Sequence, residues 1–558
     1  MIDFRRRRAK KGLEAENKKG LLGGGSIAAP ILIAAFSYLL YMGTLQFDFV
    51  YDDLALVPGN EWIRSPANIP EIFSSNMWGF GPGGRSNYYR PLIHLLLMLD
   101  YLLFGLKPWG YHLMNILFHS ANSVLVFLIA SHILRIMPKD RFTGSFWAPF
   151  VAGVLFASHP VHTEAVAWVS GLSDLSLTFF FLLSFYLFAR ATEEGHIRKG
   201  FYIGSLLSFF AAMLSKEAGV VLPAALFLYA RSFGRKISWR PYIPFLVAIG
   251  AYLGMRTYAL REFLPSLETG RPELSSFQYF INIFPLFVKY IEKLLLPVDL
   301  SAYYEFFIRS LSEPAGYISA GVTAFFLALL FLAYKKDREV FFPLSFIVLA
   351  LLPGLYIRAI PGSVLSERYL YLPSFAFIFL CGIVFKRVKS LNGKAALSAY
   401  ICVFLLAAFY SAGTLKRNPV WKDELSLWTD TAAKAPHSDR VRANYGKALL
   451  SSGRMDEAIR ELRQAIALNP GSAVPHSNLG IAYDGKGWID RAIEEFKAAI
   501  RIEPEYANAH YNLGVAYMKK GAHDKAIEEF EITLRLDPAH FQARDNLEIA
   551  KTSLPSSF

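Results

Sequence analysis

The chain is poor in cysteine, because its 558 residues contain only Cys381 and Cys402. Two cysteines cannot form the disulfide framework of a small secreted domain, and both lie in apolar runs, where we interpret them as small core residues. Charge is also scarce, since Asp, Glu, Lys and Arg make up 18% of the chain, whereas soluble domains carry about 25%. These shortages argue against a disulfide-rich scaffold and against an ordinary cytosolic enzyme.

Apolar residues are abundant instead. They account for 54% of the chain, and its 47 Phe and 29 Tyr residues exclude disorder or a fibrous repeat. The 58 Lys and Arg residues outnumber the 45 Asp and Glu residues, which leaves a formal net charge of +13. In a chain this apolar, a basic excess is more typical of cytoplasmic loops than of nucleic-acid binding. We therefore predict a polytopic membrane protein with no nucleic-acid partner.

The N-terminus shows where the basic residues gather. Residues 1–20 hold four Arg and four Lys against three acidic residues, and no charge follows between Gly20 and Phe47. A stretch of this length spans a hydrocarbon core of roughly 30 Å and lacks an obvious cleavage site. We interpret it as a signal anchor preceded by a basic cytoplasmic tail over residues 1–20. RNA binding by the Arg run is the weaker alternative.

Five further basic clusters set the predicted topology of a membrane domain over residues 21–416. The clusters lie near residues 135–141, 190–199, 231–240, 335–338 and 386–389. Placing all five in the cytoplasm gives about eleven spans and a C-terminus on the outer side. The spans lie near residues 27–46, 111–134, 146–162, 174–190, 201–215, 218–231, 241–260, 315–334, 340–357, 370–386 and 396–414. The apolar stretches 92–105 and 278–297 remain, and we predict that they are interfacial or re-entrant helices.

This topology places four segments together on the outer side. They are the loop 47–91, the turn 163–173, the link 215–219 and the loop 358–369. The unusual polar motifs of the domain lie in these segments. We therefore expect the active site on the periplasmic or lumenal side of the membrane, with a bacterial inner membrane as the expected location.

After about Arg417 the composition changes to a helical pattern that repeats every 34 residues. Small residues and helix-ending prolines recur at this interval, in the series Gly446, Gly480, Gly514 and Pro470, Pro504, Pro538. The period is that of the tetratricopeptide repeat, a helix pair. We predict an α-solenoid over residues 417–558. Its units are a half-repeat at 423–436, repeats at 439–472, 473–506 and 507–540, and a closing helix at 541–551.

Asparagine recurs at one register of these repeats, as Asn444, Asn478, Asn512 and Asn546. An amide side chain presents a donor and an acceptor, which together can pair with the C=O and N–H of a peptide without reading its side chains. The series resembles the asparagines with which the repeats of the nucleocytoplasmic O-GlcNAc transferase hold peptides. We predict that it binds an acceptor peptide; helix packing or simple solvation of these residues is the alternative.

Two adjacent carboxylates, Asp52 and Asp53, begin the outer loop about one turn beyond the first predicted span. Desolvation at a membrane surface raises the pKa of a carboxyl, which would suit one of the pair to general-base catalysis. A solvated helix cap is the alternative interpretation.

Three cations, Arg90, Lys216 and Arg368, lie at outward-facing span ends beside many apolar residues. An interfacial charge of this kind is a functional-site candidate, and a lipid phosphate is its natural counter-charge. We predict that these cations bind the phosphate of a lipid donor. Anchoring of the spans by snorkelling side chains is the alternative.

His159 and His162 are three residues apart, so they would share a face of a helix. With Glu164 they suggest a metal site, but the spacing alone is weak evidence and Pro160 disturbs the helix. We expect both histidines to support phosphate binding rather than to hold a metal.

These motifs resemble those of a known family in sequence and in order. The motifs are YDD from Tyr51, YRPL from Tyr89, HPVHTEAVAWVSG from His159, LSKE from Leu214, ERYLYLPS from Glu367 and RNPVW-KDE from Arg417. Followed by tetratricopeptide repeats, they resemble the transmembrane and tetratricopeptide-repeat-containing O-mannosyltransferases. One departure is Leu172–Asp174, where LSD stands in place of an expected R-A-D, so a basic group is missing.

The resemblance implies the GT-C glycosyltransferase fold and an enzyme that transfers mannose from a polyprenyl-phosphate donor to Ser or Thr hydroxyls of proteins. It implies that Asp52 or Asp53 is the base. A single displacement would invert the sugar's configuration, and the cations would stabilise the leaving phosphate. No cofactor is expected beyond the donor lipid. Two alternatives stay open, a transferase acting on a lipid or glycan and a non-catalytic membrane scaffold.

Overall fold

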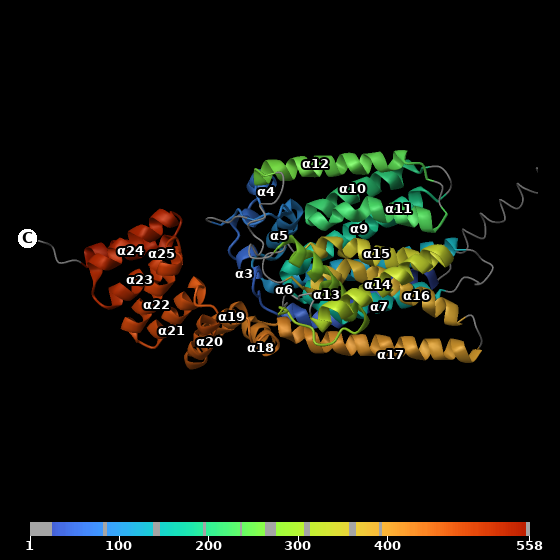
Figure 1. Cartoon of the computed structure of the whole chain (residues 1–558). Coiled ribbons are helices and arrows are strands. Elements are labelled where there is room, and N and C mark those ends of the chain that lie inside the picture. Colours follow the sequence, from blue (N-terminus) through green and yellow to red (C-terminus); the bar gives the residue numbers. More distant parts are fainter. Residues whose placement is uncertain are drawn as a thin grey trace, which may run out of the picture. The chain divides into compact units, whose positions relative to one another are not determined.

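A computed structural model of the chain describes residues 25–81, 86–137, 146–193, 197–234, 237–262, 275–305, 313–356, 364–389 and 393–553. All regular elements in these ranges are helices (Figure 1), which confirms the predicted all-α fold. The predicted basic tail, residues 1–20, lies outside the described residues. The chain divides into two compact units, of which the first contains nearly all residues up to Trp421 and the second contains the chain from Lys422 onward with two short earlier segments.

The first unit is a bundle whose long helices run side by side (Figure 1). Its helices are α2 (Gly25–Tyr41), α3 (Asp53–Leu56), α4 (Ile69–Ser74), α5 (Pro91–Phe104), α6 (Pro108–Ile136), α7 (Trp147–Ser158), α8 (Thr163–Ala167), α9 (Leu172–Ala191), α10 (Lys199–Ser215), α11 (Leu222–Ser232), α12 (Ile243–Leu260), α13 (Ser276–Leu295), α14 (Pro314–Lys336), α15 (Arg338–Leu355), α16 (Tyr371–Lys389) and α17 (Gly393–Arg417). Proline stands at the start of α5, α6 and α14, where its missing N–H costs no hydrogen bond.

Eight helical segments of the described residues are long and apolar enough to cross a membrane. They are Ile27–Gln46, Pro108–Ile136, Val169–Ala191, Arg240–Leu260, Pro314–Lys336, Arg338–Leu355, Glu367–Val388 and Gly393–Trp421. The other three predicted spans correspond to α7, α10 and α11, with 12, 17 and 11 residues. Crossing a bilayer takes about 20 helical residues, so length and composition alone identify eight of the eleven predicted spans, and the count of eleven stays a prediction.

The two stretches predicted to be interfacial form α5 and α13, and neither is among the eight candidate spans. Helix α13 is two-sided, because Phe277 and Phe280 are exposed while Tyr290 and Leu294 are buried. An ion pair joins Lys289 and Glu292 on its surface, at 2.8 Å. These features are typical of a helix that lies in the interface plane.

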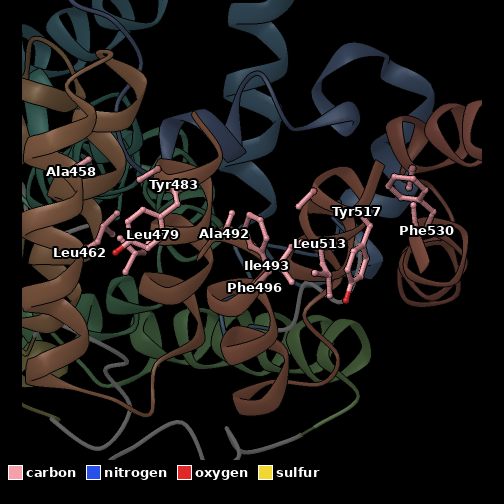
Figure 2. Packing of buried hydrophobic residues seen from close by; sticks show 14 of the residues in the cluster. Ala458, Leu462, Leu479, Tyr483, Ala492, Ile493, Phe496, Leu513, Tyr517 and Phe530 are labelled. Atoms are coloured by element: carbon pink, nitrogen blue, oxygen red, sulfur yellow. The ribbon is translucent and has the colours of Figure 1, made fainter. Parts of the chain in front are cut away.

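The second unit is a series of helix pairs. Its helices are α18 (Glu424–Lys434), α19 (Asp439–Ser451), α20 (Met455–Leu468), α21 (Ala473–Gly485), α22 (Ile489–Ile502), α23 (Ala507–Lys519), α24 (His523–Leu536) and α25 (Phe541–Thr552). Each predicted repeat holds one complete pair, α18 forms the half-repeat and α25 is the closing helix. The helices share one buried core along the series, in which Leu462, Phe496 and Phe530 recur at the repeat interval (Figure 2).

The recurring glycines are explained by this core. A Cβ on Gly480 would lie 2.5 Å from Cε1 of Phe496, and one on Gly514 would lie 2.6 Å from Cε1 of Phe530. Both distances are far below an ordinary contact between carbon atoms. A glycine is therefore required where the first helix of each pair crosses the second.

Replacing Gly480 by alanine is expected to destabilise the repeats by about 1–3 kcal/mol, because the added methyl overpacks the ring of Phe496. Hydrogen exchange of the full chain in detergent, read over α21 and α22, measures the loss. Gly471→Ala is the matched control, since its Cβ would meet nothing closer than 3.5 Å. Equal protection in both variants would contradict the packing described here.

Candidate active site

The acidic pair forms a tight turn at the start of α3. Asp53 is fully buried, and its Oδ1 accepts hydrogen bonds from the backbone N of Ser170, at 2.8 Å, and from the Ser170 hydroxyl. Its Oδ2 accepts from the backbone N of Val50, at 3.2 Å. Asp52 is half-buried, and its side chain does not cap α3. The two carboxylates thus occupy different environments, one locked by three donors and one nearer the surface.

Burial raises the pKa of Asp53 to about 7, although the hydrogen bonds from Ser170 and Val50 lower it. All three partners are donors, so the ionised carboxylate fits this site better than the acid, which carries a proton on one oxygen. The preceding residue, Tyr51, adopts a φ of 55°, in the left-handed region. That conformation costs a non-glycine residue on the order of 1–2 kcal/mol, and such strain is typical of functional turns.

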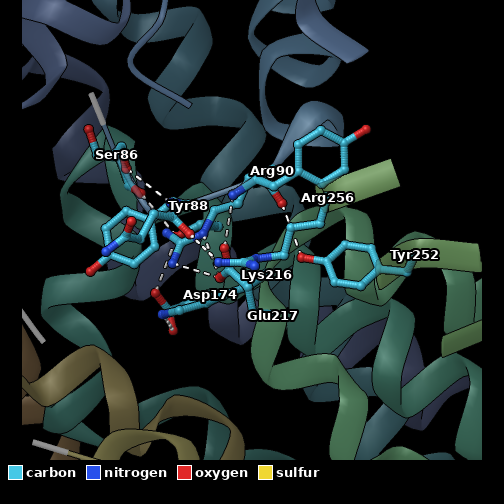
Figure 3. A network of polar contacts seen from close by, with 12 residues as sticks. Ser86, Tyr88, Arg90, Asp174, Lys216, Glu217, Tyr252 and Arg256 are labelled. Atoms are coloured by element: carbon cyan, nitrogen blue, oxygen red, sulfur yellow. Dashed lines mark hydrogen bonds and ion pairs between the residues drawn. The ribbon is translucent and has the colours of Figure 1, made fainter. Parts of the chain in front are cut away.

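A cavity of about 310 Å³ lies between the ends of several helices of the first unit. Four cations line it, namely Arg90, Lys216, Arg256 and Arg368. Three of them are the cations predicted from the sequence to bind phosphate. Figure 3 shows Arg90, Lys216 and Arg256 turned toward one another. The structure therefore brings together side chains that are up to 278 residues apart in the chain.

Carboxylates hold three of these cations in place. Nε of Arg90 donates to Oε2 of Glu217 at 3.0 Å, and Nζ of Lys216 donates to Oδ1 of Asp174 at 2.6 Å (Figure 3). Charge-assisted bonds of this kind keep long side chains in a single geometry. Burial lowers the pKa of Lys216 to about 8, although the charge of Asp174 raises it. The lysine thus titrates close to neutral pH.

Arg368 is held from two sides. It donates from its backbone N to Oε2 of Glu164, at 3.1 Å, and from its guanidinium to the other oxygen of the same buried carboxylate. The ring of Tyr369 lies 5.2 Å from the guanidinium carbon of Arg368 and 4.9 Å from Nζ of Lys216. Both cations are therefore within reach of the same aromatic ring, whose negative face attracts positive charge.

Trp168 connects the acidic turn to the cavity. Its ring stacks on Tyr51, with 6.0 Å between centroids, and its Nε1 donates to the carbonyl of Val50 at 3.3 Å. The guanidinium carbon of Arg368 lies 5.3 Å from the same indole ring. The indole of Trp168 thus contacts both the turn that holds the two carboxylates and one cation of the cavity.

The described parts of the four segments predicted to share the outer side meet here. The loop 47–91 contacts the turn 163–173 through Asp53 and Ser170, and it contacts the link 215–219 through Arg90 and Glu217. Residues 364–369 join the turn through Arg368 and Glu164. All four segments therefore lie at one end of the helix bundle.

The two histidines are placed elsewhere. His159 is fully buried, and its Nε2 bonds to the carbonyl of Leu294 at 3.1 Å. His162 is also fully buried, with Nε2 at 2.8 Å from the hydroxyl of Ser374. Neither lines the cation cavity. From the sequence we expected both histidines to support phosphate binding, but the cation cavity described here does not include them.

Among the described residues no cluster of three or more His, Cys, Asp or Glu side chains has the geometry to hold a metal ion. Glu164, which the sequence suggested as a companion of the histidines, is instead the partner of Arg368.

Several residues of the site were not predicted. Arg256 is buried in the candidate span Arg240–Leu260, where an arginine within an apolar helix was the available signal. Asp174 belongs to the LSD departure noted above, and its carboxylate faces Lys216. Glu217 directly follows Lys216 in the sequence, yet its partner Arg90 lies 127 residues away. Only the fold reveals these pairings.

The four asparagines of the repeats occupy the same position in the first helix of successive pairs. They lie in α19, α21, α23 and α25, each five residues after the helix begins. Asn478 is 9% exposed, and the other three are half-buried. The amide of Asn546 donates to the hydroxyl of Tyr511 at 3.1 Å. The series therefore follows one face of the solenoid.

These features define the class of the molecule, an α-helical membrane protein with tetratricopeptide repeats in its second unit. Models of the tetratricopeptide repeat match residues 446–487, 485–521 and 507–540. Two solved repeat structures show local likeness, the first tetratricopeptide domain of Spaghetti and the protein MamA, at 22% and 28% identity. They cover 21% and 23% of this chain and 92% and 75% of their own, with TM-scores of 0.21 and 0.22.

Relatives of most of the chain are named protein O-mannosyl-transferases. One from Caenorhabditis elegans is 28% identical and aligns with 79% of this chain and 62% of its own length. Human TMTC1 is 29% identical over 81% and 56%, and human TMTC2 is 26% identical over 78% and 62%. This chain is thus homologous to protein O-mannosyl-transferases, which confirms the predicted resemblance. It spans about three fifths of the length of these relatives.

Proposed function

We propose that the protein is an integral-membrane glycosyltransferase that moves a sugar, mannose by analogy with its relatives, from a polyprenyl-phosphate donor to Ser or Thr hydroxyls of proteins. The observation that carries the proposal is the carboxylate turn joined to a cation-lined cavity through Trp168. Transfer from a phosphate-linked sugar needs a base for the acceptor hydroxyl and cations for the leaving phosphate, at neighbouring positions.

The charges of the cavity suit a donor with a single negative charge. Its four cations are accompanied by Asp174 and Glu217 in the lining and by Glu164 behind Arg368, which leaves one positive charge among the described residues. A sugar linked to a lipid through one phosphodiester carries one negative charge. Arginine and lysine donors that are already oriented would stabilise the second charge that the phosphate gains as it leaves.

Asp52 is the proposed base, and Asp53 is a positioning residue. The oxygens of Asp53 are occupied by three donors and have no access to solvent, whereas Asp52 is half-buried beside them. Asp52 takes the proton of the acceptor hydroxyl, and the oxygen of that hydroxyl attacks the anomeric carbon of the sugar. The bond from that carbon to the phosphate oxygen breaks, and polyprenyl phosphate leaves with the electron pair. One displacement of this kind inverts the configuration of the sugar.

The repeat unit would hold the acceptor. A row of amides at one helix position matches the backbone of an extended peptide, in which C=O and N–H groups are free to pair. A lipid acceptor gives such a row no role. We propose no cofactor beyond the donor lipid.

The orientation proposed for the membrane unit follows from the ends of its helices. Helix α9 begins beside Asp174 of the cavity and ends at Arg190, and α16 begins after Arg368 and ends with Lys386 and Arg387. Clusters of basic residues thus mark the end of the bundle opposite to the cavity. From the positive-inside rule we propose that this end faces the cytoplasm and that the site lies on the periplasmic or lumenal side.

The proposal is tested with purified protein in detergent, polyprenyl-phosphate mannose labelled in the sugar, and a Ser/Thr-rich peptide. Label is expected on the peptide and should be absent from a matched peptide with alanine at every Ser and Thr. Label transferred to a lipid or glycan in the same reaction would favour the alternative acceptor. Absence of transfer from mannose, glucose and arabinose donors alike would favour a non-catalytic scaffold.

The rate is expected to depend on pH as a bell, with limbs near 7 and 8. Below about pH 7 Asp53 gains a proton and no longer fits its three donors, and above about pH 8 Lys216 loses its charge. Ser170→Ala should move the acid limb to higher pH, since its hydrogen bond lowers the pKa of Asp53. A profile of wild type and Ser170→Ala with identical acid limbs would contradict this assignment.

Replacing Asn444, Asn478 and Asn512 together by alanine is expected to raise KM for a long peptide acceptor by about tenfold, because several backbone hydrogen bonds worth about 1 kcal/mol each are lost, partly offset by water. KM for a peptide of a few residues should not change, since it is too short to reach along the repeats. Arg440, Arg454 and Arg460 changed together to glutamine provide the control of equal size. Unchanged KM for both acceptors would exclude the asparagine row as a binding site.

A further inference from the structure

The motif RNPVW, which begins at Arg417, closes the first unit, and the chain continues into the second unit with Lys422. Its last four residues form a short 3-10 helix, η12 (Asn418–Trp421), directly after α17. Trp421 is 2% exposed, and its indole Nε1 has no hydrogen-bond partner among the described residues. The role of this side chain must therefore lie in the packing of its ring.

The ring of Trp421 packs against the aromatic side chains of the acidic turn. It stacks on the ring of Trp168, with 5.7 Å between centroids and 23° between planes. Trp168 also stacks on Tyr51, with 6.0 Å between centroids and 30° between planes. Aromatic pairs of this kind attract each other beyond the effect of burial alone. Tyr51, Trp168 and Trp421 thus form one aromatic stack, which reaches from the end of the first unit to the residue before Asp52.

Trp168, which contacts both other rings of the aromatic stack, fixes the donors that hold Asp53. Its Nε1 donates to the carbonyl of Val50, and the backbone N of Val50 donates to Oδ2 of Asp53. Ser170, two residues after Trp168, donates to Oδ1 of Asp53 from its backbone N and its hydroxyl. A displaced indole would therefore displace the donors to both oxygens of this carboxylate.

Tyr51 makes the acidic turn sensitive to a loss of packing. Its φ of 55° is unfavourable for a tyrosine, and such a conformation persists only where the surrounding structure holds it. The stacked ring of Trp168 is part of that surrounding structure. Asp52, the proposed base, directly follows Tyr51. If Tyr51 relaxed to an ordinary φ, the carboxylate of Asp52 would move with the backbone.

The chain before Trp421 is anchored to two other helices. Oγ1 of Thr414 donates to the carbonyl of Ser158, the last residue of α7, at 2.8 Å. The amide of Asn418 donates to the carbonyl of Leu40, in the last turn of α2, at 3.0 Å. Both donor side chains are buried, so water does not compete for these bonds. Trp421 is thus fixed in place and can support the ring that it contacts.

We propose that Trp421 is a positioning residue of the transferase site, which holds the indole of Trp168 and, through it, the carboxylates of Asp52 and Asp53 in the geometry that sugar transfer requires. Trp421 does not line the cation cavity, so it acts through Trp168 and not on the donor. The inference rests on the proposed function, because it takes Asp52 as the base. It gives a role to the RNPVW motif, whose last residue directly precedes the second unit.

Kinetics of the full-length protein with a short peptide acceptor test the effect on the reaction. Trp421→Met replaces the ring by a flexible apolar chain and should lower kcat by about 100-fold, the effect of displacing a reacting group by about 1 Å. KM for the donor should change by less than about threefold, because the phosphate contacts are made from the cavity.

Two variants make the kinetic result specific. Trp421→Phe keeps a stacking ring, and the N–H that it lacks has no partner among the described residues, so kcat should stay within about threefold of wild type. Tyr410→Met removes another buried ring, from α17, and should retain the wild-type kcat.

Hydrogen exchange provides a readout that does not require transfer, and it therefore separates this inference from the proposed function. The backbone N–H groups of Val50 and Ser170, which bond to Asp53, should exchange about tenfold faster in Trp421→Met than in wild type or Tyr410→Met. If Trp421→Met does not fold, Asn418→Ala removes the bond to Leu40 and should accelerate the same groups by about threefold.

The proposal is overturned if the folded variant, Trp421→Met or Asn418→Ala in its place, exchanges at these groups as wild type does. It is also overturned if Tyr410→Met shows the same acceleration, or if Trp421→Phe loses as much activity as Trp421→Met. Faster exchange in a protein that transfers no sugar would overturn the proposed function and retain Trp421 as the residue that holds the acidic turn.

Discussion

Replacing Asp52 by asparagine is expected to lower the rate of sugar transfer by on the order of 10²–10⁴-fold, the usual contribution of a general base. Asparagine keeps the size and the hydrogen-bonding capacity of the residue but cannot accept the proton of the acceptor hydroxyl. The effect should fall on kcat, with little change in KM for the donor, because the phosphate contacts are made by other residues. Initial rates with saturating donor and peptide provide the measurement.

Two further variants make this result specific. Glu71→Gln removes an exposed carboxylate from the same outer loop and should leave the rate unchanged. Asp53→Asn should also reduce the rate, but together with thermal stability, because an amide cannot accept from Ser170 and Val50 as the carboxylate does. If Asp53→Asn lost activity at full stability while Asp52→Asn stayed active, the two roles would be reversed.

Replacing Arg368 by glutamine is expected to lower kcat by on the order of 10²–10³-fold, the cost of removing one oriented charge from a developing anion. The guanidinium borders both the cavity and the indole of Trp168, and that indole stacks on Tyr51 of the acidic turn. Steady-state kinetics with varied donor concentration separate the loss in kcat from the rise in KM that weaker phosphate binding also causes.

Stability must be measured beside these rates. Glu164 is buried against Arg368, and breaking a buried ion pair costs about 3–5 kcal/mol when one charge remains. Arg368→Lys keeps the charge and should restore part of the rate, whereas Arg231→Gln, at the opposite end of α11 from the link 215–219, should have no effect. A folded Arg368→Gln variant with the wild-type rate would exclude this cation from the reaction.

The repeat unit was predictable in detail, because the same residue types recur in its sequence at a fixed interval. Gly480 and Phe496 recur with their neighbours at 34 residues, and a fixed interval defines both the helix pair and its packing. The membrane unit has no repeated interval of this kind. Its helices α7 and α11 have only 12 and 11 residues, because turns interrupt the continuous apolar sequence at places that its composition does not mark.

The candidate site was predictable in its residue types but not in its pairings. Asp52, Arg90 and Arg368 are recognisable because charges are rare in an apolar chain and expensive near a membrane. Their partners are not, since Glu164 and Arg368 are 204 residues apart. His159 and His162 are the opposite case. They are recognisable in the sequence as a polar motif, but in the fold both are buried and bond to Leu294 and Ser374 instead of lining the cavity. Whether a recognisable residue belongs to the site, and which partner it has, depends on how the fold brings distant parts of the chain together.

The most direct measurement compares wild type, Asp52→Asn and Arg368→Gln in one assay for transfer of labelled mannose from its polyprenyl-phosphate donor to a Ser/Thr-rich peptide. If the turn and the cavity form one transferase site, wild type labels the peptide and each folded variant loses most of that activity, Asp52→Asn in kcat alone and Arg368→Gln in kcat and donor KM. Peptide labelling that is equal in all three proteins would contradict a shared site at Asp52 and Arg368.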